Sequence, residues 1–231
     1  MRLLIDHDIL LYRALWGCKG NYWQKLQTCD YMIEKLMDKL NSNDITLFIS
    51  GAGNFRYDIA PTYKANRKDQ PKPEYLYDAK LYYVKYWDAA VSDGVEADDA
   101  IGMAHDDETI VVSSDKDFFQ LGGLIYNPVK DQMYEITNPW YFFYMQMLVG
   151  DDADNIEGVK NPEKSHHKVP PNFTEATAKR QIEGLDAEQC RLEVQSLYED
   201  QYEDKWFEHY DLNAKLLFLK RADAQEYYEA F

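Results

Sequence analysis

The stretch Thr109-Ile-Val-Val-Ser-Ser-Asp-Lys-Asp117 carries the pattern that decides the fold class. Its first half is an apolar, β-branched run bounded by polar residues, which predicts a strand over 109–113. Its second half places two carboxylates, Asp115 and Asp117, just past the end of that strand. The N-terminal Leu3-Leu4-Ile5-Asp6 has the same arrangement, an apolar strand that ends in a carboxylate.

Helix-like and strand-like segments alternate between these two strands. The elements expected there are a helix over 22–40, a strand over 45–49, and helices over 74–87 and 97–104. Such alternation predicts an α/β fold with a central, mostly parallel sheet flanked by helices. Because ligands of such sheets bind at the carboxyl ends of the strands, Asp6 and Asp115 are expected to meet at one edge.

The second half of the chain has a different pattern and is expected to be mostly helical. Residues 139–149 form an apolar, aromatic run, and residues 158–174 form a Pro/His/Lys-rich segment that predicts a loop. Helices are expected over 174–182, 187–198 and 206–231.

Composition narrows the class of protein. The 231 residues, 45% of them apolar, suit one domain or a catalytic domain with a modest appendage. Three widely spaced cysteines without a CxxC pair argue against a disulfide scaffold or a zinc site and indicate the cytoplasm. No apolar run approaches the roughly 18–20 residues that span a bilayer, so no membrane partner is expected.

The net charge of −16, taken alone, argues against a nucleic-acid partner, because phosphate binders are usually basic. The charge is unevenly distributed, however. Residues 56–85 contain seven basic and four acidic residues, whereas acids gather at 96–117 and 151–154. Carboxylates gathered at one site repel each other, and bound divalent cations would relieve that repulsion.

Four groups of carboxylates are candidates for such a site. They are Asp6, the set Glu96, Asp98 and Asp99 at helical spacing, the pair Asp115 and Asp117 past a strand, and the pair Asp151 and Asp154 on a helix-like turn. Mg²⁺ and Mn²⁺ prefer carboxylate oxygens, and two such ions roughly 3.5–4 Å apart can promote phosphodiester hydrolysis. Acidic runs are usually solvated surface, and spacing alone leaves both interpretations open.

Five ordered motifs between residue 3 and about residue 160 also resemble a known family. They are Leu4-Ile5-Asp6, Phe55-Arg56 with Pro61-x-Tyr63-Lys64-Ala65-Asn66-Arg67, Glu96-Ala97-Asp98-Asp99, Ser114-Asp115-Lys116-Asp117-Phe118, and Gly150-Asp151-x-x-Asp154-Asn155-Ile156-x-Gly158-Val159. The chain resembles the phage and bacterial 5′-nucleases, which include flap endonucleases and 5′–3′ exonucleases, and in size the short phage exonucleases. The resemblance implies a PIN-like fold and metal-dependent hydrolysis of DNA near 5′ ends by a phage-encoded enzyme.

The resemblance also assigns roles by position. A first metal site would use Asp6, Glu96, Asp98, Asp99 and Asp115, and a second would use Asp115, Asp117, Asp151 and Asp154, with two Mg²⁺ or Mn²⁺ ions. Lys64 and Arg67 match the family's basic pair at the base of its helical arch, which contacts the scissile phosphate. Tyr63 would stack on a terminal base, and the neighbouring Arg56 and Lys68 would also contact DNA.

The expected domain organisation and partner follow from the same resemblance. An α/β catalytic core is expected over 1–149, including a basic arch region near 56–90. A helical DNA-binding region with a degenerate helix–three-turn–helix is expected over 150–231. The partner would be duplex DNA with a 5′ end or 5′ flap, bound by a monomer in the cytoplasm, that of the host cell for a phage protein.

Two positions depart from the family pattern. Ser50 stands where the family usually has an aspartate at the end of the second strand, and a neutral hydroxyl binds Mg²⁺ more weakly. After Val159, residues 160–168 lack the glycines of the family's hairpin, which puts its grip on duplex DNA in doubt. Two alternatives therefore stay open, a PIN-like ribonuclease acting on RNA or RNA primers and a DNA-binding module with weakened catalysis.

A few other residues permit both a structural and a functional interpretation. Arg13 is either a substrate contact or half of a salt bridge. His166-His167 is expected to be an exposed loop pair rather than a metal site. Tyr141 and Tyr144 are expected to pack in the core rather than stack on bases.

Overall fold

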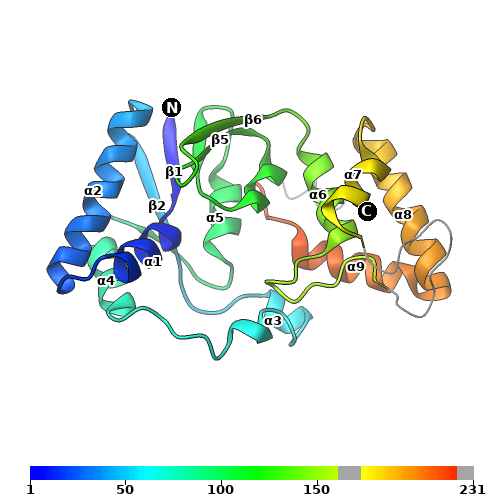
Figure 1. The fold of residues 1–231 in the computed structure, drawn as a ribbon, viewed down its shortest axis with the longest axis horizontal. Helices are drawn as coiled ribbons and strands as arrows, with labels where there is room; N and C mark the ends of the chain where they lie inside the picture. The colour runs from blue at the N-terminus through cyan, green and yellow to red at the C-terminus, as the bar shows by residue number, and fades with distance from the viewer. Residues whose placement is uncertain (161–172, 223–231) are drawn as a thin grey trace. The chain divides into compact units, whose positions relative to one another are not determined.

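The computed structural model describes residues 1–160 and 173–222, which are drawn in colour in Figure 1. These residues form two compact units. The first contains Met1–Asn54, Gln70–Ile136 and a short segment that begins at Lys220, and the second contains Phe55–Asp69 and Thr137–Leu219. Each unit has its own hydrophobic core. The domain boundary expected near residue 150 stays a prediction.

A six-stranded sheet is the centre of the first unit. Its strands, in spatial order, are β3 (Ala90–Ser92), β2 (Ile45–Ser50), β1 (Arg2–Asp6), β4 (Thr109–Val112), β5 (Gly123–Asn127) and β6 (Gln132–Ile136). Neighbouring strands are parallel except β5 and β6, which pair antiparallel at one edge. The predicted α/β class with a mostly parallel sheet is therefore confirmed.

Both faces of the sheet are covered by helices (Figure 1). Leu3 and Ile5 of β1 are buried in a core shared with α1 (His7–Gly17), α2 (Tyr22–Leu40) and α4 (Leu76–Tyr86). Leu4 points to the opposite face, on which α5 (Ala97–Ala104) contacts β1 and β2. Strands buried on both faces have continuous apolar runs, which explains the Leu3–Ile5 pattern.

The helix α2 has the bounds that the sequence predicts, and its ends show why. Asn21 accepts a hydrogen bond from the Gln24 N–H, and the Gln24 side chain accepts one from the Asn21 N–H. This reciprocal capping box satisfies N–H groups that the first helical turn leaves unpaired. At the other end Asn41 takes the left-handed conformation, which asparagine tolerates better than most residues.

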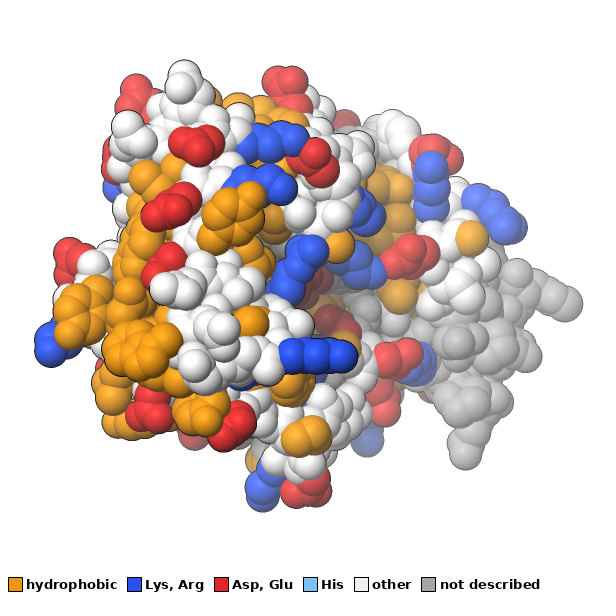
Figure 2. All heavy atoms as spheres, turned by 60° about the vertical axis from the view of Figure 1, so that its left-hand side comes forward, with side chains coloured by type: hydrophobic (Ala, Val, Ile, Leu, Met, Phe, Trp, Pro, Cys, Tyr) orange, Lys and Arg blue, Asp and Glu red, His pale blue; other side chains and the backbone are white. Residues whose placement is uncertain are grey.

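The helices of the first unit also carry an exposed aromatic surface. Trp16, Trp23, Tyr31 and Tyr86 are each between 59% and 64% exposed. Figure 2 brings the left-hand side of Figure 1 forward and shows hydrophobic side chains, in orange, gathered on this part of the surface. The apolar residues of α1, α2 and α4 are therefore divided between the core and the surface.

The second unit is built from helices. They are α3 (Arg56–Ile59), the 3₁₀ helix η1 (Ala65–Arg67), α6 (Pro139–Val149), α7 (Glu175–Ile182), α8 (Ala187–Tyr202), the 3₁₀ helix η3 (Glu203–Lys205) and α9 (Trp206–Leu217). The core lies mainly among α6, α7, α8 and α9. Tyr144 is buried in it, as predicted, and Tyr141 packs against it partly buried. The mostly helical C-terminal half is confirmed for the described residues.

Several elements differ from the sequence pattern. The pattern does not predict α1, because α1 follows β1 without an intervening turn and the two apolar runs merge. Nor does it predict the three-residue β3 or the β5–β6 hairpin. The helix predicted over 206–231 ends at Leu217, since the backbone is extended at Phe218.

Other predictions fall on residues that the structure does not describe. They concern the end of the helix predicted to reach Phe231, most of the loop predicted over 158–174 with His166-His167, and much of the degenerate helix–three-turn–helix. Among the described helices, none combines the length and the apolar character needed to cross a membrane.

Candidate active site

Asp6 and Asp115 lie at the same edge of the sheet, as the strand pattern predicts. Asp6 is the last residue of β1 and Asp115 follows β4, and these two strands are adjacent and parallel. The Ser113 hydroxyl donates a hydrogen bond to Asp6 Oδ2 at 2.9 Å, and the Asp115 N–H donates to Ser113 Oγ at 3.1 Å. The two carboxylate residues are therefore linked through one serine side chain.

Asp6 is 5% exposed, and its surroundings disfavour a negative charge. Its pKa is raised from 3.8 to about 7, first by desolvation and then by the nearby carboxylates of Asp8 and Asp115. The hydrogen bond from Ser113 acts in the opposite direction. A cation bound beside Asp6 would favour the charged carboxylate and remove part of this cost.

Asp8 is a carboxylate that the sequence motifs do not single out. Its Oδ2 accepts a hydrogen bond from the Ser50 N–H at 2.9 Å, and its Oδ1 lies 2.8 Å from Lys80 Nζ. Lys80 also donates to the Ser50 carbonyl oxygen at 2.8 Å. The structure therefore places a carboxylate from α1 beside the strand end where the family pattern expects an aspartate. The spacing Asp6-x-Asp8 directly after a strand is the sequence signal for it.

The carboxylates at the start of α5 form caps. Glu96 and Asp99 make a capping box, in which the Glu96 N–H donates to Asp99 Oδ2 at 3.3 Å. Asp99 is fully buried and also accepts a hydrogen bond from the Lys220 N–H at 3.1 Å. Asp98 is half-buried on the first turn of the helix. Glu96 and Asp99 thus have structural partners, in addition to their predicted role as ligands.

Asp115 and Asp117 stand at the start of the 3₁₀ helix η2 (Lys116–Leu121). Asp115 Oδ1 accepts a hydrogen bond from the Asp117 N–H at 3.0 Å and so caps this helix. Both residues are half-buried, whereas Lys116 between them is exposed. The local geometry of this motif follows from the cap rather than from a continued strand.

Asp151 and Asp154 belong to the second unit and lie on a tight turn. Asp151 Oδ1 accepts hydrogen bonds from the N–H groups of Ala153 at 2.8 Å and of Asp154 at 3.3 Å. Gly150 has a φ of +74°, and a Cβ there would lie 2.3 Å from the Ile156 carbonyl oxygen. The Gly150-Asp151-x-x-Asp154 motif therefore forms a tight turn. Its backbone conformation requires a glycine at position 150 and fixes the spacing between Asp151 and Asp154.

Two motifs that are distant in sequence meet on this turn. Lys64 Nζ lies 3.4 Å and Arg67 Nη2 lies 2.6 Å from the carboxylate of Asp154. The backbone holds the same segments together, since the Lys64 N–H donates to the Asp154 carbonyl oxygen at 2.9 Å and Arg67 Nε to that of Ala153 at 2.8 Å. The predicted phosphate contacts are thus ion-paired with a predicted metal ligand.

Two residues expected to contact DNA are instead buried in the core of the second unit. Arg56 is 1% exposed, and it donates to the carbonyl oxygens of Leu216 at 2.8 Å and Phe218 at 2.9 Å. These bonds give Arg56 a structural role, because a buried guanidinium must satisfy its donors within the protein, and its DNA contact stays a prediction. Tyr63 is 3% exposed, so its ring does not stack on a base in this conformation. Lys68 is exposed.

Hard oxygen donors dominate the candidate site, which suits Mg²⁺ or Mn²⁺. The raised pKa of Asp6 indicates the cost of gathering these carboxylates without a cation. Within residues 1–160 and 173–222, however, no three His, Cys, Asp or Glu side chains form a group that could hold a metal ion. The oxygen-donor chemistry of these residues fits a divalent cation.

Comparison with known proteins connects this arrangement to a family. The family described as "5′-3′ exonuclease, N-terminal resolvase-like domain" matches residues 1–138. A 5′-3′ exonuclease of Buchnera aphidicola subsp. Schizaphis graminum is 28% identical over 186 residues, which cover 68% of this chain and 64% of that protein. The match thus spans less than two thirds of the relative's own length.

Solved structures of bacteriophage T5 proteins have the same fold. A T5 protein co-crystallised with metal ions has a TM-score of 0.67 at 18% identity, over 99% of this chain and 95% of that chain. The T5 flap endonuclease in a complex with DNA and metal ions has a TM-score of 0.58 at 16% identity, over 94% and 98%. The family model matches residues 1–138, which are more than half of this chain. The chain therefore belongs to the family of 5′-3′ exonucleases that have this N-terminal resolvase-like domain.

Proposed function

We propose that the chain is a divalent-metal-dependent 5′–3′ exonuclease or flap endonuclease that hydrolyses phosphodiester bonds of DNA near 5′ ends. The observation that carries the proposal is the meeting of Asp6 and Asp115 at one sheet edge, where burial and neighbouring carboxylates raise the pKa of Asp6. Membership of the exonuclease family supports the same reaction. The substrate would be duplex DNA with a 5′ end or a 5′ flap, bound by a monomer.

Two divalent ions, Mg²⁺ or Mn²⁺, would be held by carboxylates. The proposed ligands are Asp6, Glu96, Asp98, Asp99 and Asp115 for one ion, and Asp115, Asp117, Asp151 and Asp154 for the other. When bound, such ions activate a water and stabilise the departing oxygen of a phosphodiester. The ligands all come from aspartate and glutamate, which suits ions that prefer oxygen donors.

Asp8 would compensate for the missing carboxylate at Ser50. Its Oδ2 is held by the Ser50 N–H, and its negative charge contributes to the raised pKa of Asp6. Lys80 neutralises Asp8 in the described structure, with side-chain exposures of 23% for Lys80 and 21% for Asp8. A divalent cation would therefore compete with the Lys80 ammonium for this carboxylate.

Lys64 and Arg67 would hold the scissile phosphate through charge-assisted hydrogen bonds. Both cations are paired with Asp154 in the described structure, so a phosphate would compete with that carboxylate for them. The Arg67 side chain is 44% exposed, against 17% for Lys64. Arg67 is therefore the more accessible of the two to incoming DNA.

Replacement of Asp115 tests the proposal. The wild-type chain should degrade linear 5′-phosphorylated duplex DNA in the presence of Mn²⁺ or Mg²⁺. Addition of EDTA should stop this degradation. Asp115→Asn should lower the cleavage rate by at least about 10²–10³-fold while its circular dichroism and melting temperature stay close to wild type. Asp107→Asn, at an exposed acid after α5, is the matched control and should keep the wild-type rate. Wild-type turnover by the Asp115 variant would refute the assignment.

The same assay separates the alternatives. Faster cleavage of an RNA of matched sequence would favour a ribonuclease. Binding of DNA without cleavage under any divalent metal would favour a binding module in which Ser50 marks the loss of catalysis.

A further inference from the structure

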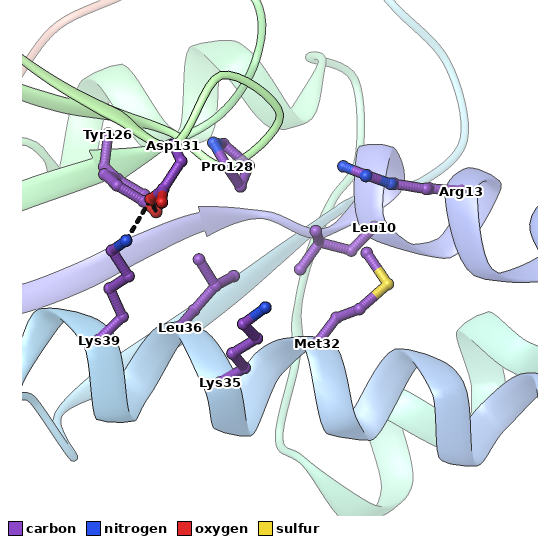
Figure 3. A pocket seen from close by; sticks show the side chains of 9 residues that line it. All are labelled: Leu10, Arg13, Met32, Lys35, Leu36, Lys39, Tyr126, Pro128 and Asp131. Atoms are coloured by element: carbon purple, nitrogen blue, oxygen red, sulfur yellow. Dashed lines mark hydrogen bonds and ion pairs between the residues drawn. The ribbon is translucent and has the colours of Figure 1, made fainter.

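A second polar site lies in the first unit and includes none of the proposed metal ligands. It is a pocket of about 270 Å³ formed by α1, α2 and the turn between β5 and β6 (Figure 3). Its apolar lining includes Leu10 of α1 and Met32 and Leu36 of α2. A cavity of this size lies just below the roughly 300–1,000 Å³ typical of small-molecule sites, so it suits a ligand no larger than one nucleotide.

Three basic side chains line the same pocket. Figure 3 shows Lys35 and Lys39 extending from α2 toward the hollow and Arg13 extending toward it from α1. Lys35 and Lys39 are four positions apart on one helix face, where like charges repel. Three cations around one hollow are unusual in a chain whose net charge is −16.

Only one of the three cations forms a direct ion pair with a neighbour. Lys39 forms an ion pair with Asp131, which also accepts a hydrogen bond from the Tyr126 hydroxyl. Within the described ranges, Arg13 and Lys35 form no hydrogen bond or ion pair. The salt bridge that is one interpretation of Arg13 is thus not formed there. Asp131 also interacts electrostatically with Lys35. The pocket therefore keeps an excess of positive charge, three cations against one lining carboxylate, beside an apolar wall.

We propose that this pocket binds a nucleotide through its phosphate group. Arg13 presents a planar guanidinium suited to two phosphate oxygens, and Lys35 adds a point charge from the facing helix. The sugar or base would pack on Leu10, Met32 and Leu36. The ligand class follows from this pairing of excess positive charge with an apolar wall, and mononucleotides are the product class of the proposed function. A free mononucleotide and one nucleotide of a DNA strand present the same chemistry.

Calorimetric titration of the full chain in EDTA tests the proposal without requiring catalysis. The probes are deoxyadenosine monophosphate, deoxyadenosine, and a short single-stranded oligodeoxynucleotide. The variants are Arg13→Gln and Lys35→Gln, both at exposed positions, with Lys85→Gln on α4 as the matched control outside the pocket. Melting temperatures verify that each variant is folded.

The monophosphate should bind wild type at least about tenfold more tightly than deoxyadenosine, and each pocket variant should weaken it about tenfold. The control should stay within about twofold of wild type. If only the oligonucleotide binds and the same two variants weaken it, the source is a DNA strand and the proposal is supported. Equal binding of the monophosphate and deoxyadenosine, or no effect of either variant on any probe, would overturn it. If wild type shows no nuclease activity but binds the monophosphate as described, the proposed function is contradicted and the pocket proposal is not.

Discussion

Asp6→Asn isolates the electrostatic cost of the candidate active site. Asparagine keeps an oxygen that can accept the hydrogen bond from Ser113 but carries no charge. In wild type the pKa of Asp6 is raised to about 7 in the folded protein, against 3.8 for the ordinary side chain. The folded protein therefore binds this proton more tightly than the unfolded chain does. The resulting stabilisation is fully present below about pH 3.8 and is lost as the pH rises through about 7.

The magnitude follows from the two pKa values. Their difference of about 3, at 1.36 kcal/mol for each pKa unit, corresponds to at most about 4 kcal/mol. The free energy of unfolding of wild type, relative to Asp6→Asn, should fall by up to that amount between about pH 4 and about pH 8. Above about pH 8 the difference should change little, because the carboxylate is then charged in both states.

Urea unfolding of both proteins in EDTA, at about pH 4, 6 and 8, measures this difference. Asp107→Asn is the control for removing one negative charge from an acidic chain. Adding Mn²⁺ at about pH 8 should restore stability to wild type more than to Asp6→Asn, since only wild type keeps the buried charge. A wild-type minus Asp6→Asn difference that is the same at every pH would refute the reasoning.

Three further predictions follow from buried or paired side chains. Arg56→Met should lower the free energy of unfolding, measured in urea, by about 3 kcal/mol or more. The reason is the loss of two hydrogen bonds from a charged donor to carbonyl groups at the end of α9, and a urea unfolding midpoint equal to that of wild type would contradict the structural role of Arg56. His7 is fully buried and its pKa is lowered from 6.5 to about 3, first by desolvation and then by Lys80. Wild type should therefore lose stability relative to His7→Phe as the pH falls below about 6.5, by about 2 kcal/mol at pH 5, and a constant difference would show that folding does not lower the pKa of His7. Lys80→Met should raise the affinity for Mn²⁺, measured by calorimetry, because it frees the Asp8 carboxylate, whereas Lys85→Met should leave the affinity unchanged. Weaker Mn²⁺ binding by the Lys80 variant would exclude competition between this lysine and the metal.

The sequence by itself was sufficient for the central strands of the sheet and for part of the site. Apolar runs at Leu3–Ile5 and Thr109–Val112 predict buried strands from local pattern alone, and both are present. Parallel strands end at the same edge, so the meeting of Asp6 and Asp115 also follows from local pattern and chain order. The bounds of α2 follow in the same way, because its caps are set by neighbouring residues.

Other features depended on partners that local sequence does not reveal. Arg56 lies in a basic segment, and such segments are usually exposed, yet it is buried because carbonyl groups far along the chain accept its hydrogen bonds. The position of Asp8 against Ser50 depends on α1 starting immediately after β1. The β5–β6 hairpin is an edge pairing that short, mixed segments do not predict.

The sequence alone therefore determined the α/β class, the strand-end carboxylates and the order of the motifs, since each depends on neighbours a few positions away. Only the tertiary structure decided which charges neutralise which. It paired Asp154 with Lys64 and Arg67 and paired Asp8 with Lys80. Among the described residues it left Arg13 and Lys35 without a direct ion pair. The energy of a charge depends on its burial and on groups within a few ångströms, and the fold alone sets both.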